Sequence, residues 1–89
     1  MSDTTARLAR FAAALRAIRH ERGLSQRDLA SIVSTYDDHF GRPLRCTYSY
    51  LARLELGERV PSLHMVEGLA RALSVPREHL LDSAGDQSA

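Results

Sequence analysis

The sequence contains no lysine: all 12 basic residues are arginine, they face 11 acidic residues, and the formal net charge is +1. A GC-rich genome, whose codons favour Arg, Ala and Leu, explains this bias most simply, and selection for guanidinium chemistry is the alternative. A chain so close to neutral gives no general argument for a nucleic-acid partner. The arginines are unevenly placed, since residues 1–60 hold ten of them against seven acids and residues 61–89 hold two against four. Any surface for a polyanion is therefore expected in the first two thirds of the chain.

Other absences narrow the class of protein. No apolar run approaches the roughly 20 residues of a membrane-spanning helix, and no signal peptide opens the chain, so we expect a cytoplasmic protein. The single cysteine, Cys46, excludes an internal disulfide framework. No segment shows the alternating, β-branched pattern of a strand. With 89 residues, 44% of them hydrophobic, the chain has room for one small core.

The residue patterns that carry catalysis or hold cofactors are also missing. There is no glycine-rich phosphate loop, and Cys46 has no histidine and acid arranged around it as a nucleophile requires. Residues 37–39, Asp-Asp-His, match no known spacing of metal ligands. The other histidines fall on separate predicted helices without a motif: His20, His64 and His79. We therefore expect no enzyme activity, no metal site and no cofactor.

Apolar residues recur at helical spacing in five segments. The first helix is expected from a cap at Thr4 or Thr5 to about Arg22, where Gly23 provides a stop. The second begins at a capping box formed by Ser25 and Asp28. Its apolar stripe continues past Val33 through Tyr36 and Phe40 to the stop at Gly41, so we expect this helix to run to about residue 40, with a loop over residues 42–46.

Three shorter helices follow in the second half of the chain. Thr47 caps a helix that ends before Gly57, and Ser62 caps one that ends at Leu73. Pro76 suits the first turn of a fifth helix that ends near Leu81. Residues 82–89 are expected to form a disordered polar tail. The sequence thus predicts an all-α domain of five helices over residues 1–81.

Three segments resemble one known family. They are residues 18–30 (IRHERGLSQRDLA), 50–62 (YLARLELGERVPS) and 69–75 (LARALSV). In this order and spacing they resemble the lambda-repressor-like (XRE-type) helix-turn-helix DNA-binding family, over about residues 12–81. The resemblance implies a five-helix DNA-binding domain and a regulator of transcription, such as a repressor or a developmental or phage-type regulator. It also implies a cytoplasmic, nucleoid-associated protein.

The resemblance assigns roles to particular residues. The helix after Thr47 corresponds to the recognition helix, whose expected base contacts are Tyr48, Ser49, Ala52 and Arg53. The expected phosphate contacts are Arg19, Gln26, Arg42, Arg45, Thr47, Tyr50 and Arg59. The family also pairs an arginine late in the first helix with a glutamate late in the third, here Arg19 and Glu55. The alternatives are a phosphate-bound or solvated Arg53, a solvated Gln26, and unrelated surface charges at Arg19 and Glu55.

The chain departs from the family between the second and third helices. That connection normally has three or four residues, but thirteen, residues 34–46, separate Val33 from Thr47 here. This insertion could contact DNA through Arg42 and Arg45. It could instead present a hydrophobic patch to a partner, or serve as a spacer. The residues of that patch would be Tyr36, Phe40 and Leu44.

Two partners are expected on these grounds. One is double-stranded DNA with an inverted repeat, bound by a homodimer, because a single domain of this kind makes few base contacts. The candidate dimer residues are Leu73, Val75, Leu80 and Leu81. The competing hypothesis is a protein-interaction module, such as the antitoxin half of a toxin–antitoxin pair, with residues 34–46 as the partner surface.

Overall fold

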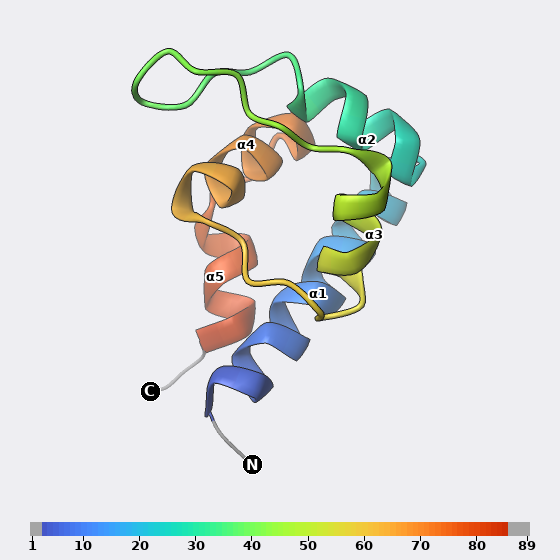
Figure 1. The fold of residues 1–89 in the computed structure, drawn as a ribbon. Coiled ribbons are helices and arrows are strands. Elements are labelled where there is room, and N and C mark those ends of the chain that lie inside the picture. Colours follow the sequence, from blue (N-terminus) through green and yellow to red (C-terminus); the bar gives the residue numbers. More distant parts are fainter. Residues whose placement is uncertain (1–2, 86–89) are drawn as a thin grey trace.

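The computed structural model describes residues 3–85, which form five helices and no named strand. The helices are α1 (Asp3–Glu21), α2 (Gln26–Val33), α3 (Tyr48–Glu55), α4 (Leu63–Leu73) and α5 (Glu78–Gly85). Figure 1 shows α1 and α5 side by side, with α2, α3 and α4 completing the domain around them. The expected all-α, five-helix fold is confirmed. None of the described helices is long and apolar enough to cross a bilayer.

The helix boundaries follow from local hydrogen bonding. Ser25 and Asp28 form the expected capping box at the start of α2, with the Asp28 N–H donating to Ser25 Oγ at 3.0 Å. Thr47 and Ser62 cap α3 and α4 in the same way, each accepting from the backbone N–H three residues on. α1 ends where Gly23 adopts a φ of +70°, and the Leu24 N–H reaches back to the carbonyl of Arg19.

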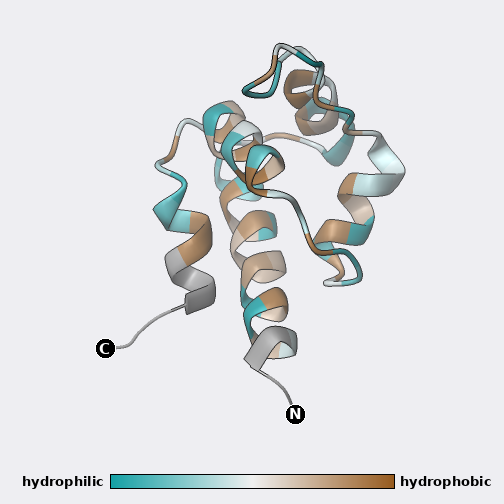
Figure 2. Cartoon of the chain, turned by 60° about the vertical axis from the view of Figure 1, so that its left-hand side comes forward, coloured by the Kyte–Doolittle hydropathy of each residue, from teal (hydrophilic) through white to brown (hydrophobic). Residues whose placement is uncertain are grey.

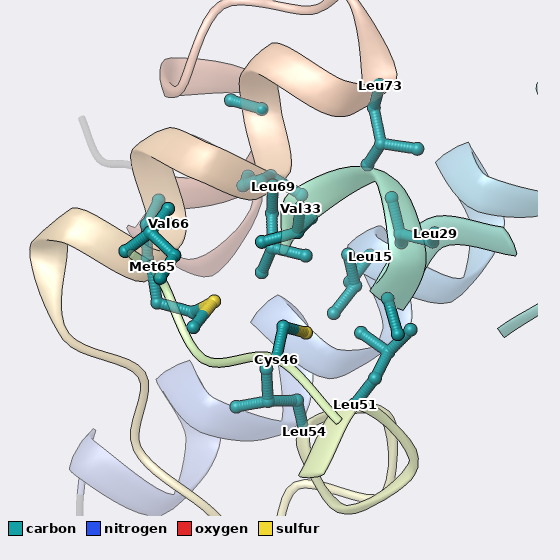
Figure 3. Close-up of a cluster of buried hydrophobic side chains, with 14 of the residues drawn as sticks. Leu15, Leu29, Val33, Cys46, Leu51, Leu54, Met65, Val66, Leu69 and Leu73 are labelled. Atoms are coloured by element: carbon teal, nitrogen blue, oxygen red, sulfur yellow. The ribbon is translucent and has the colours of Figure 1, made fainter. Parts of the chain in front are cut away.

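The interior is made mostly of leucine side chains from all of the helices. Figure 3 shows labelled side chains of α1, α2, α3 and α4 meeting in one cluster, to which α5 adds Leu80. Burial of each such side chain contributes about 1.5–3 kcal/mol, before the entropy of ordering it is subtracted. In Figure 2, brown and teal stretches alternate along the helices, as expected when each helix buries one face. The fully buried members are Leu15, Leu29, Val33, Leu51, Leu54, Leu69, Leu73 and Leu80.

The expected continuation of the second helix to residue 40 is wrong, because α2 ends at Val33. The hydroxyls of Ser34 and Thr35 donate to carbonyls of the last turn, those of Ala30 and Ile32, at 2.9 and 2.7 Å. Such side-chain bonds compete with the helical ladder. The acidic pair that follows, residues 37–38, would also be unfavourable near the negative end of a helix dipole. The hydroxyl hydrogen bonds and the acidic pair thus end the helix at Val33, although the apolar spacing of Tyr36 and Phe40 favours its continuation.

Residues 36–44 form a hairpin instead. Its two arms pair through the Leu44 N–H and the Tyr36 carbonyl at 2.9 Å, and an antiparallel bridge links Asp37 to Pro43. Asp38 organises the turn, because its Oδ1 accepts from the backbone N–H groups of Phe40 at 2.8 Å and Arg42 at 3.0 Å. The bond from Arg42, and then that from Phe40, lowers the pKa of Asp38.

The hairpin is anchored by the side chain of Leu44. Leu44 is only 8% exposed and belongs to the main hydrophobic cluster, in contact with Gly68 of α4. A Cβ at position 68 would lie 2.5 Å from Leu44 Cδ1, so the glycine is what admits this side chain. The expected patch of Tyr36, Phe40 and Leu44 therefore does not form: Leu44 and part of Tyr36 pack inward, and Phe40 alone is exposed, at 74%.

The C-terminal part differs from expectation in two ways. α5 continues to Gly85, four residues beyond the expected end at Leu81, and residues 86–89 of the expected tail lie outside the described residues. Two of the proposed dimer residues, Leu73 and Leu80, are fully buried within the single chain. Leu81 is 38% exposed and Val75 is half-buried, so only these two retain surface for a partner.

We expect Leu44→Ala to lower the free energy of unfolding by about 2–4 kcal/mol, because it opens a cavity between the hairpin and α4. Phe40→Ala in the same hairpin should cost less than about 1 kcal/mol, because that side chain is exposed. Urea titration followed by circular dichroism measures both values. Equal small losses would show that the hairpin is a spacer without a structural anchor.

Candidate nucleic-acid interface

The outward face of α3 carries the residues expected to contact bases. Thr47 caps the helix through its Oγ1, which accepts from the Tyr50 N–H at 3.0 Å. Tyr48, Ser49 and Arg53 are exposed and Ala52 is half-buried, so they form one face of the helix. The opposite face is in the core: Leu51, Leu54 and Glu55. The structure therefore presents the four expected base-contact residues together.

A buried ion pair fixes α3 against α1. Arg19 Nε donates to Glu55 Oε2 at 2.5 Å, and Arg19 Nη2 donates to Glu55 Oε1 at 2.9 Å. The two residues are 8% and 3% exposed, so this is a bidentate pair inside the domain. The hydrogen bond to Glu55 raises the pKa of Arg19 above its usual value. The structure thus contains the Arg19–Glu55 pair that the family resemblance implies.

Further hydrogen bonds connect this pair to the first residue of α2, to the turn before it and to another arginine of α1. Gln26 Nε2 donates to Glu55 Oε1 at 3.0 Å, and Arg19 Nη1 donates to the Leu24 carbonyl at 2.9 Å. Arg16 Nη1 donates to the backbone carbonyl of Glu55 at 3.0 Å. We call these five residues, Arg16, Arg19, Leu24, Gln26 and Glu55, the Glu55 network. The phosphate role expected for Arg19 needs correction, because its guanidinium is buried and bonded within this network.

One contact at this face has no counterpart in the sequence analysis. The Arg27 guanidinium lies 4.6 Å from the centroid of the Tyr48 ring, which joins the first turn of α2 to the first turn of α3. Arg27 is exposed and directly follows Gln26. Its position beside Gln26, in the first turn of α2, could have suggested Arg27 as a functional residue. Its contact with Tyr48 could not be predicted, because the long connection between α2 and α3 separates the two residues in the sequence.

The remaining expected phosphate contacts fall in two places. Arg45 is exposed two residues before Thr47, and Arg59 is exposed in the connection after α3, where its charge acts on the half-buried Tyr50. Burial is the main cause of the raised pKa of Tyr50. Arg42 is not with them: its guanidinium lies 5.9 Å from the Phe40 ring centroid, in the hairpin that reaches over α4 and away from α3 in Figure 1.

Cys46 is placed for packing. It is 4% exposed, within the core cluster shown in Figure 3, and burial raises its pKa to about 11. A buried thiol with a raised pKa is a poor nucleophile and a poor metal ligand, because both roles need the thiolate.

The protein-family model of a helix-turn-helix domain matches residues 10–82 of this chain. The chain belongs to this helix-turn-helix family. Among solved structures it is similar to the restriction-modification controller protein C.AhdI from Aeromonas hydrophila, at 32% identity and a TM-score of 0.68, over 82% of this chain and 94% of that one. It is also similar to the clp gene regulator ClgR from Corynebacterium glutamicum, at 26% identity and a TM-score of 0.72, over 88% of this chain and 71% of that one.

A third similar structure is the DNA-binding domain of BldD, at 28% identity and a TM-score of 0.65, over 91% of this chain and 99% of that one. A comparison with curated proteins finds no matching sequence. The family and the all-α fold expected from the motifs are therefore confirmed.

We expect Glu55→Ala to lower the free energy of unfolding by about 3–5 kcal/mol, because it leaves the Arg19 guanidinium buried without its counter-ion. Glu58→Ala, at an exposed acid three residues on, should cost less than about 0.5 kcal/mol. Denaturant unfolding measures both, and loss of a cooperative transition in Glu55→Ala alone would agree with the upper end. Similar values for the two variants would contradict the structural role of the pair.

The Cys46 thiol should react slowly with an alkylating reagent at pH 8 while the protein is folded. A pKa of about 11 instead of 9.0 reduces its thiolate fraction about 100-fold, and the rate should keep rising with pH well past 9. Mass spectrometry of timed samples, with a urea-unfolded control, measures the rate. Equal rates in the folded and unfolded protein would contradict this burial.

Proposed function

We propose that this protein is a sequence-specific, double-stranded DNA-binding regulator of transcription that reads the major groove with α3. The observation that carries the proposal is the outward face of α3, where Tyr48, Ser49 and Arg53 project from a helix held by the Glu55 network. A recognition helix needs this combination, because exposed side chains can read bases only if their backbone is fixed in register.

Each exposed residue of α3 has a chemistry that suits base edges. Arg53 can donate two hydrogen bonds to O6 and N7 of a guanine. Ser49 can bond to a base or a phosphate, and Tyr48 offers a ring to a thymine methyl group, with Arg27 stacked on that ring. Ala52 is small enough to let the helix approach the groove closely.

The surrounding polar groups suit the DNA backbone. The first backbone N–H groups of α2 have no partner within the helix and attract a phosphate. One amide N–H of Gln26 is held by Glu55, which leaves the second for the same phosphate. Thr47, Tyr50, Arg45 and Arg59 flank α3 and complete the proposed phosphate contacts, to which we add Arg27.

We further propose that the protein acts as a homodimer on an inverted repeat, as a repressor in the cytoplasm. An eight-residue recognition helix contacts few bases, so two copies are needed for useful specificity. The matched proteins described above as a controller and a gene regulator favour a regulatory role over the antitoxin alternative.

The test is DNA binding by variants of Arg53, on a site selected from genomic fragments. Arg53→Ala should lose about 1–3 kcal/mol, roughly 5- to 150-fold in Kd, and relax the preference at one base position. Arg53→Lys keeps the positive charge but cannot make the bidentate hydrogen bonds to guanine. It should therefore lose the base preference and retain most of the salt-dependent affinity. Fluorescence anisotropy over a salt series measures both, and two chains per site would support the dimer.

Arg77→Ala is the matched control, because it removes one arginine just before α5, which Figure 1 places on the opposite side of the domain from α3. It should bind within about twofold of the unchanged protein. Undiminished binding by Arg53→Ala, or an equal loss in Arg77→Ala, would overturn the assignment of base readout to Arg53. Absence of binding to every genomic fragment would overturn the proposed function itself.

A further inference from the structure

The hairpin and α4 line a polar cavity, open to solvent on one side, that the proposed DNA contacts do not use. It has a volume of about 210 Å³ and lies between hairpin residues 36–39 and one side of α4. His39 from the hairpin meets His64 and Glu67 from α4 here, and one potential ligand atom from each lies within 4.8 Å of the others. His64 and Glu67 are three residues apart, so one turn of helix places both on the same side.

The three groups make a recognised type of metal-ligand set. Two imidazoles and one carboxylate suit zinc and similar divalent transition metals, whereas magnesium and calcium prefer oxygen ligands alone. Ligands of a tetrahedral zinc ion lie about 3.4 Å apart, given metal–ligand bonds of about 2.0–2.1 Å. A spacing within 4.8 Å can close to that value through small rotations of the side chains.

The histidine on α4 has an unmet bonding requirement. His64 Nδ1 is buried and has no hydrogen-bond partner, the only such side-chain atom found in the described part of the chain. Leaving a buried polar atom without a partner costs free energy, and an exception of this kind needs an explanation. The ring lies near two aromatic residues of the hairpin, 5.3 Å from the His39 centroid and 6.0 Å from that of Phe40. Those contacts hold the ring but satisfy no nitrogen.

Charges around the cavity favour a cation. Asp37 and Asp38 line it together with Glu67, while the one arginine in its lining, Arg71, lies 4.4 Å from the Tyr36 ring centroid. Glu67 Oε2 accepts from Arg77 Nη1 at 2.5 Å. A carboxylate has two oxygens, so this bond orients Glu67 and leaves the other oxygen for a metal ion.

We propose that His39, His64 and Glu67 bind one divalent transition-metal ion of the zinc type, which fastens the hairpin to α4. Three protein ligands leave a further position that water or a cavity aspartate can fill. The site escapes sequence analysis because its ligands come from two elements that only the hairpin brings together. Metal binding would add a second anchor to the hairpin, besides Leu44, on the segment that leads into Thr47 and α3.

The experiment is calorimetric titration of zinc chloride into the full chain after treatment with a chelator. We expect one ion per chain and a rise in the midpoint of thermal unfolding when zinc is present, because a ligand of the folded state stabilises it. Magnesium chloride should do neither. His39→Ala and Glu67→Gln should each weaken zinc binding at least tenfold. Loss of a residue that only hydrogen-bonds to a metal ligand already lowers metal affinity about 10- to 100-fold, so loss of a ligand itself should cost at least as much.

His79→Ala on α5 is the matched control, because it removes a histidine that does not line the cavity. It should leave the zinc affinity within twofold. His39 is exposed, so its substitution should preserve the fold, which the unchanged thermal midpoint of the zinc-free variant checks. No zinc binding, binding unaffected by His39→Ala and Glu67→Gln, or an equal loss in His79→Ala would each overturn the proposal.

Discussion

The candidate interface depends on the buried ion pair between Arg19 and Glu55. A short helix of eight residues has little stability of its own, so its position must come from tertiary contacts. Leu51 and Leu54 bury one face of α3, but apolar contacts alone permit sliding and rotation. The bidentate geometry of the pair adds directional bonds to this packing, and Gln26 and Arg16 bond to the same glutamate. Glu55 therefore links α1, α2 and α3 by hydrogen bonds, in addition to the apolar core that these helices share.

This role gives a physical meaning to the arginine-only composition. Arg16 and Arg19 of α1, and Arg22 directly after it, each donate from the guanidinium to a backbone carbonyl: Arg16 to Glu55, Arg19 to Leu24, and Arg22 to Leu73 at 2.7 Å. Helix ends leave such carbonyls without partners, and a planar group with five donors can bond to one while also pairing with a carboxylate. The lysine ammonium has three donors on one nitrogen, so it lacks the planar fork that bonds to both carboxylate oxygens while reaching a carbonyl on another side. The count of 12 arginines thus overstates the charge available to DNA.

The parts of the fold that follow from local rules could be predicted from the sequence. Ser25, Thr47 and Ser62 start helices, and Gly23 ends one, because each satisfies backbone groups within a few residues of itself. Residues 34–46 could not be predicted in this way. Their apolar spacing favoured a helix, whereas the observed hairpin depends on Leu44 reaching a glycine 24 positions further along the chain. Periodicity does not contain that information.

The candidate sites likewise contain features that could be predicted from the sequence and features that could not. The exposed face of α3 could be predicted because its spacing is fixed by one helix, and the Arg19–Glu55 pair could be predicted only through the family resemblance. The contact between Arg27 and Tyr48 and the cluster of His39, His64 and Glu67 join different elements across the long connection. The His39 cluster exists because α2 stops at Val33, since a helix continued to residue 40 would not form the turn that brings His39 over α4. The polar residues that end α2 thereby determine what the hairpin places against α4.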